Sequence, residues 1–147
     1  MIEPLGWHIQ LWTNSARLLE IGNILDDVPL PIVLDHMGQF PVAEGVEGKQ
    51  FQNILRLLDD PRFWIKLVGY RVSQSPPAFE DIHAAAKMLV ATAPDRCLWG
   101  TDWPHIYLEG RPMPNTTELF EQALDWVSPQ HAQSVFVENP ARLYGFS

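Results

Sequence analysis

A fourfold alternation of apolar runs and amphipathic segments constrains the fold of this chain more than any other feature of its sequence. Each apolar run is followed by a loop and then by a segment whose apolar residues recur at helical spacing. The apolar runs cover residues 7–12, 31–36, 63–68 and 97–102, and the amphipathic segments cover residues 15–25, 49–58, 79–92 and 116–127. Strands of this kind, alternating with helices, are typical of parallel sheets with right-handed crossovers. The sequence therefore predicts an α/β fold built from four parallel βα units.

A further helix is predicted after these four units, over residues 129–137. Ser128 stands at its N-cap position, and Pro129 suits the first helical turn. Asn139 and Pro140 follow, and a proline disfavours continuation of a helix. We therefore expect the helix to end before the C-terminal tail.

Composition and charge narrow the class of protein. The chain has 147 residues, enough for one ordinary domain, and 46% of them are hydrophobic. A net charge of −8 leaves no basic stripe for phosphates, so nucleic acid is not expected as a partner. Cys97 is the only cysteine, which excludes an internal disulfide and fits a cytoplasmic protein. The sequence shows no signal peptide and no apolar run long enough to span a membrane, so we expect no membrane partner.

Polar side chains gather where three of the predicted strands end. Parallel α/β proteins assemble their sites at the carboxyl ends of strands, whereas the short connections at the other ends serve as turns. The polar residues at these carboxyl ends are Asp35 and His36, Tyr70 and Arg71, and Asp102 and His105. This rim of the sheet is therefore the predicted site of any chemistry.

Each of these residues also has a purely structural interpretation. Asp102 directly follows an apolar strand and suits a catalytic base held ionised by nearby histidines, but an aspartate before a loop also forms Asx-turns. His36 is placed to bind a metal or stabilise an oxyanion, or to bond a backbone carbonyl. His105 follows Pro104 and equally fits a tight turn. Arg71 is suited to hold a ligand or to form a surface salt bridge. Lys66 lies within an apolar strand and either snorkels or points into the site.

Several stretches together resemble the amidohydrolase-related family of the amidohydrolase superfamily, most closely its 2-pyrone-4,6-dicarboxylate lactonase-like members. These stretches are "LWGTDWPH" at residues 98–105, "PMPN" at 112–115 and the ending "ENPARLYGF", with "PIVLDHMG" and "FWIKLVGYR" as similar strand ends. The resemblance covers essentially the whole chain. It implies a (β/α)₈ TIM-type barrel whose site lies on the carboxyl-end rim.

The resemblance also implies roles for the residues at this rim. Asp102 would activate the hydrolytic water, and His36 would polarise the substrate carbonyl. His105 and Arg71 would bind the substrate, with Arg71 suited to grip a carboxylate, and we expect Tyr70 and Lys66 to contact the substrate as well. The expected reaction is hydrolysis of a lactone or similar cyclic ester of a carboxylated metabolite, without a cofactor. The alternative is a zinc-dependent hydrolase or decarboxylase of the same family, in which His36 and Asp102 would be metal ligands.

The chain departs from the family pattern in its number of strands. A full barrel has eight strands and roughly 250 residues, whereas this sequence supplies four predicted strands and contains no H-x-H pair. We therefore expect residues 1–147 to form the C-terminal half of a barrel, corresponding to strands five to eight. Such a chain would be a truncated product, a piece of a split enzyme or a partial sequence. A rival hypothesis is a catalytically incomplete half-barrel that acts only by assembling with itself or with an N-terminal half.

Overall fold

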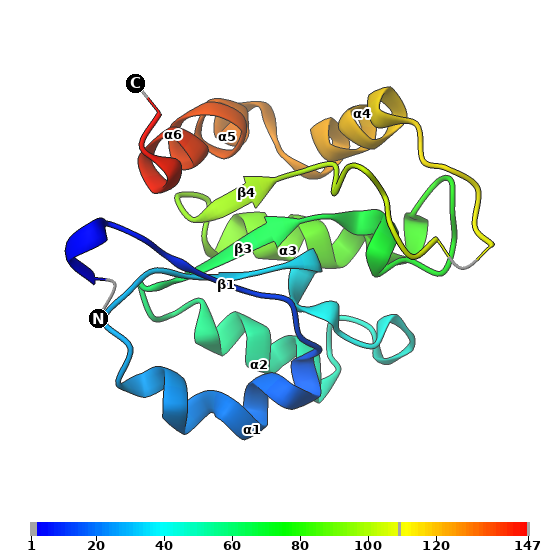
Figure 1. Ribbon diagram of the computed structural model, residues 1–147. Coiled ribbons are helices and arrows are strands. Elements are labelled where there is room, and N and C mark those ends of the chain that lie inside the picture. The colour runs from blue at the N-terminus through cyan, green and yellow to red at the C-terminus, as the bar shows by residue number, and fades with distance from the viewer. Residues whose placement is uncertain (1–2, 109, 147) are drawn as a thin grey trace.

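The computed structural model describes residues 3–108 and 110–146, and a single parallel sheet organises this part of the chain (Figure 1). Its strands lie side by side in sequence order: β1 (Ile9–Leu11), β2 (Ile32–Leu34), β3 (Phe63–Leu67) and β4 (Cys97–Trp99). The register is regular, since Val33 lies opposite both Gln10 and Trp64. This arrangement confirms the predicted α/β fold and matches half of a (β/α)₈ barrel.

A helix follows each strand and packs beside the sheet. These helices are α1 (Ser15–Asp26), α2 (Lys49–Leu57), α3 (His83–Thr92) and α4 (Thr116–Trp126). Asn14 and Asn115 cap α1 and α4, because each side-chain oxygen accepts a backbone N–H of the first turn at 2.9 Å. The helix predicted from residue 79 begins only at His83, since Phe79 has a left-handed φ of 52° and interrupts the helical path. None of the helices in the described residues is long and apolar enough to cross a membrane.

The two faces of the sheet bury different side chains, because successive residues of a strand point to opposite sides. The outer face, which carries the helices, holds a continuous apolar core. This core includes Ile32, Leu34, Ile65, Leu67 and Cys97 from the strands and Leu18, Phe51, Ile54, Leu89 and Ala123 from the helices. The inner face has a small separate apolar cluster of Val33, Trp64 and Leu98.

The C-terminal segment forms a longer helical run than the sequence predicts. Helix α5 (Pro129–Gln133) passes through a π-helical turn, Ser134–Glu138, into α6 (Asn139–Tyr144). The expectation that Asn139 and Pro140 end the helix is therefore wrong. Pro140 lies in the first turn of α6, where its missing N–H is not needed. Ser128 does occupy the N-cap position of α5, although its side chain makes no cap hydrogen bond.

The last residues close the amino end of the inner face. Leu143 packs against the inner apolar cluster, and the Arg142 guanidinium lies 4.9 Å from the centre of the Trp64 ring. The buried Asn139 amide fixes this helix by donating to the carbonyl oxygens of Pro94 and Cys97, each at 2.8 Å. The carboxyl end of the sheet carries the polar residues described next.

Candidate active site

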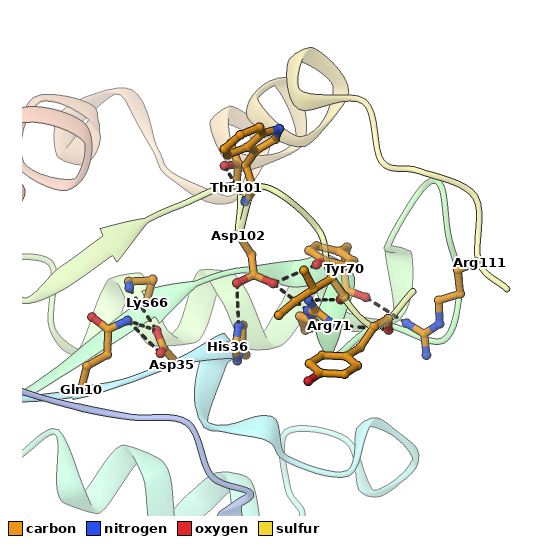
Figure 2. Close-up of polar contacts among 12 residues, drawn as sticks. Gln10, Asp35, His36, Lys66, Tyr70, Arg71, Thr101, Asp102 and Arg111 are labelled. Carbon is orange, nitrogen blue, oxygen red and sulfur yellow. Dashed lines mark hydrogen bonds and ion pairs between the residues drawn. The ribbon is translucent and has the colours of Figure 1, made fainter. Parts of the chain in front are cut away.

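Loops at the carboxyl ends of three strands bring the predicted site residues together (Figure 2). His36 follows β2, Tyr70 and Arg71 follow β3, and Asp102 follows β4. The strands predicted to reach residues 36 and 102 end earlier, at Leu34 and Trp99. His36 and Asp102 have φ angles of 50° and 58°, which no strand accommodates. Left-handed backbone at non-glycine residues is costly and is concentrated at functional sites.

The Asp102 carboxylate is the centre of this arrangement. Its Oδ2 atom accepts hydrogen bonds from the Tyr70 hydroxyl at 2.8 Å and from Arg71 Nε at 2.6 Å. Its Oδ1 atom lies 3.3 Å from His36 Nε2, which is a longer contact. The Asp102 side chain is 28% exposed, so it remains accessible at the mouth of the site. Asp102 therefore has one firmly held oxygen and one oxygen that is more loosely engaged.

The surroundings fix the protonation states of three groups. Burial raises the pKa of the Asp102 carboxyl, but hydrogen bonds from Arg71, Tyr70 and His36 outweigh burial and hold this pKa below its usual value. Burial and the neighbouring Asp102 raise the pKa of Tyr70, so its hydroxyl stays protonated and donates. Burial also lowers the pKa of His105. At neutral pH the site thus combines a carboxylate, a phenol and a neutral imidazole.

His105 lies behind Tyr70 and does not contact the Asp102 carboxylate through its side chain. The His105 ring packs edge-on against the Tyr70 ring, with centroids 5.2 Å apart, and the residue is only 3% exposed. Neither of its ring nitrogens has a hydrogen-bond partner among the described residues. Its backbone N–H donates to the Asp102 carbonyl oxygen at 2.9 Å. The structure thus brings His105 to the site, and its role in substrate binding stays a prediction.

Lys66 points to the inner face of the sheet, beside the site. Its Nζ atom lies 3.0 Å from Asp35 Oδ1, and Gln10 Nε2 donates to both oxygens of the same carboxylate at 3.1 and 2.9 Å. Figure 2 shows this group next to His36 and separate from the residues around Asp102. Lys66 is therefore held by Asp35, and its predicted contact with substrate stays a prediction.

All three guanidinium nitrogens of Arg71 donate hydrogen bonds within the protein. Its Nε atom binds Asp102, and its two terminal nitrogens donate to the backbone oxygens of Ile106 and Tyr107. These bonds tie the loop after β4 to the loop after β3. They also orient the guanidinium toward protein groups, and its predicted grip on a substrate carboxylate stays a prediction.

Sequence reasoning missed several residues that border the site. A cavity of about 320 Å³ beside Arg71 is lined by Trp12, Gln39, Arg71, Tyr107 and Arg111. Trp12 follows β1, and Tyr107 and Arg111 belong to the long loop after β4. Their position on carboxyl-end loops is the signal that could have identified them, since the same signal singled out Asp102.

The described residues do not fit a metal ion by themselves. No set of three His, Cys, Asp or Glu side chains in this part of the chain is arranged to hold a metal. His36 and Asp102 do face each other, but two ligands are fewer than a zinc site uses. The firmly held Asp102 oxygen is also already bound to the Arg71 cation.

Two curated relatives share this sequence over almost all of the chain. A 4-sulfomuconolactone hydrolase of Hydrogenophaga intermedia is 35% identical over 144 residues, which cover 96% of this chain and 48% of the relative. A 2-pyrone-4,6-dicarboxylate hydrolase of Comamonas testosteroni is 32% identical, over 97% of this chain and 50% of the relative. The chain thus spans about half the length of the curated relatives it matches.

The chain is also similar to a solved structure and to a family model. The crystal structure of an Agrobacterium tumefaciens protein superposes with a TM-score of 0.85 at 28% identity, over 99% of this chain and 53% of that chain. The family model described as amidohydrolase matches residues 1–146. With its parallel sheet and its polar carboxyl-end rim, the chain belongs to the amidohydrolase family.

Proposed function

We propose that this chain supplies the water-activating half of a lactonase active site, which opens a lactone or similar cyclic ester bearing an acidic substituent. The observation that carries the proposal is the geometry of Asp102, with Oδ2 fixed by Arg71 and Tyr70, Oδ1 in a longer contact with His36, and a side chain that is 28% exposed. The names of the two relatives, both hydrolases of acidic cyclic compounds, support this substrate class.

In the proposed reaction, Asp102 acts as the general base. Its carboxyl, whose pKa lies below the usual value, is ionised at neutral pH and is therefore in the form that can accept a proton. Because Tyr70 and Arg71 both bind Oδ2, Oδ1 is the oxygen that a water molecule would approach. Asp102 would take a proton from that water as the water oxygen attacks the lactone carbonyl carbon.

The carbonyl oxygen then needs a partner for its developing negative charge. His36 Nε2 lies 3.3 Å from Asp102 Oδ1, so a carbonyl placed against the attacking water would be within its reach. The resulting tetrahedral species collapses by breaking the ring C–O bond, and the departing oxygen takes the proton held by Asp102. In this scheme Arg71 positions Asp102.

We infer that a second half-barrel completes the site. The two outermost strands, β1 and β4, each pair with one neighbour among the described residues, whereas every strand of a closed barrel pairs with two. The family pattern places its H-x-H pair on the first barrel strand, and this chain contains none. We therefore propose that residues 1–147 correspond to strands five to eight, with the partner either another chain or a preceding segment.

The test uses a chimeric barrel in which this chain replaces the matching half of the Hydrogenophaga intermedia hydrolase. We expect it to hydrolyse 2-pyrone-4,6-dicarboxylate or 4-sulfomuconolactone, and Asp102→Asn to lower kcat by about 10²–10⁴-fold with little change in KM. The matched control is Asp125→Asn, which removes an exposed carboxylate from α4 and should leave kcat unchanged. An Asp102→Asn variant within about threefold of the unmodified chimera would exclude the water-activating role.

A further inference from the structure

A second arginine, Arg111, lines the cavity beside Arg71, and its contacts indicate a different role. Arg111 lines this cavity, and one of its terminal nitrogens donates to the backbone oxygen of Tyr70 at 3.0 Å. Within the described residues, the Arg111 side chain makes no other hydrogen bond or ion pair. Figure 2 shows the Arg111 guanidinium beyond Arg71, on the side away from Asp102.

The two arginines differ in what their guanidinium groups contact. Arg71 donates to Asp102, Ile106 and Tyr107, and its side chain is only 12% exposed. Arg111 is an exposed residue anchored by a single backbone oxygen. A planar guanidinium that is anchored at one nitrogen still presents donors in a fork that matches a carboxylate or sulfonate.

Two of the three other residues that line the cavity are aromatic, and the third is Gln39. Trp12 and Tyr107 border it with rings that are 6.4 Å apart between centroids and tilted by 32°. Their residues are 59% and 69% exposed, which leaves large apolar ring surfaces beside the two arginines. Flat apolar surfaces beside a cation suit a flat ring that carries an anionic group.

A second cavity that Arg111 borders has a different chemistry. It measures about 160 Å³, and Pro76, Pro77, Pro112, Met113, Pro114 and Leu119 are among its lining residues. Glu118 also lines it, and a carboxylate there would repel an anion. The cavity shared with Arg71 is therefore the one suited to a negatively charged ligand. Because the chain carries a net charge of −8, an anion needs such a local cation to be held near the site.

We propose that Arg111 is the specificity-determining residue that binds the carboxylate or sulfonate of a planar ring substrate while the ring packs against the exposed surfaces of Trp12 and Tyr107. The proposal deepens the function proposed above and rests on it for the identity of the substrate. It separates two tasks, since Arg71 positions Asp102 and Arg111 selects the substrate. It also transfers the predicted grip on a substrate carboxylate from Arg71 to Arg111.

The test measures binding of isophthalate, a planar ring with two carboxylates and no lactone bond, to this chain by isothermal titration calorimetry. Isophthalamide is the uncharged probe of the same shape. We expect Arg111→Met to weaken isophthalate binding by about tenfold or more and Arg111→Lys to weaken it less, because lysine keeps the charge without the fork. Isophthalamide binding should be the same in all variants. Arg56→Met, which removes an exposed arginine from α2, is the matched control and should bind both probes like the unmodified chain.

The outcomes separate this proposal from the proposed function. If Arg111→Met binds isophthalate as tightly as the unmodified chain, or if the unmodified chain prefers neither probe or binds neither, the role of Arg111 is overturned. A thermal melt equal to that of the unmodified chain shows that a weakened variant is still folded. If isophthalate binding depends on Arg111 but the chimeric barrel hydrolyses neither lactone, the anion site stands and the lactonase proposal fails.

Discussion

The outer and inner faces of the sheet differ in the side chains that cover them. On the outer face, helices α1 to α4 cover the strands with a continuous apolar core. On the inner face, one small cluster is covered by Leu143, and the rest carries Gln10, Asp35 and Lys66. The helices thus cover the outer face, while the inner face holds polar groups beside its small apolar cluster. The continuous apolar core thus lies on the outer face, while the inner face carries polar side chains next to the candidate site.

The largest expected effect concerns the state of association. Among the described residues, β1 and β4 each pair with one strand, and strand edges that lack a partner pair readily with other chains. We therefore expect the chain to sediment at micromolar concentration as a dimer or larger species, or to bind a half-barrel that supplies the missing strands. A single species of monomer mass, with a melting temperature independent of concentration, would show that the sheet needs no partner and would contradict this prediction.

A second prediction compares single truncations on the two faces. Ile65 lies in the continuous outer core, and Leu98 lies in the small inner cluster. Buried Leu or Ile to Ala substitutions lower the free energy of unfolding by roughly 2–5 kcal/mol, and less where the site can collapse. We expect Ile65→Ala near the upper end of this range and Leu98→Ala near its lower end. Urea denaturation measures both, and a larger loss for Leu98→Ala would reverse the proposed division.

The smallest expected effect is a dependence of stability on pH. Burial lowers the pKa of His105 in the folded chain below the 6.5 of an unperturbed histidine. The unfolded chain therefore binds this proton first on acidification, so stability is full above about pH 6.5 and declines as pH falls toward the lower folded pKa.

His105→Phe, which keeps an aromatic ring against Tyr70, should remove this part of the decline. The measurement compares the melting temperatures of both proteins between about pH 7 and about pH 5. Equal slopes for the variant and the unmodified chain would show that His105 does not contribute.

Much of the fold could be predicted because it depends on local patterns. The alternation of apolar runs and helical segments located all four strands and their helices. The errors lie where tertiary contacts override local preference. The Asn139 amide is bound by Pro94 and Cys97, more than forty residues earlier, and the helix continues through a site that looked like its end.

The sequence predicts where the site lies, but it does not predict which side chains of the site contact one another. The rule that parallel sheets carry their chemistry at carboxyl ends found Asp102, His36 and Tyr70, and these side chains do meet. No rule based on spacing indicates that Arg71 binds Asp102 across separate loops, or that Arg111 reaches the same cavity. These contacts depend on how the loops after β3 and β4 pass over the carboxyl ends of the strands.

The closure of the inner face by Leu143 and Arg142 has a consequence for assembly. The chain carries its own floor, because its last helix is anchored through Asn139 to the segment that enters β4. A partner that completed the barrel would therefore meet an amino end that Leu143 and Arg142 already cover on this half. The position of this cover is therefore set within one chain, by the hydrogen bonds of Asn139 to Pro94 and Cys97.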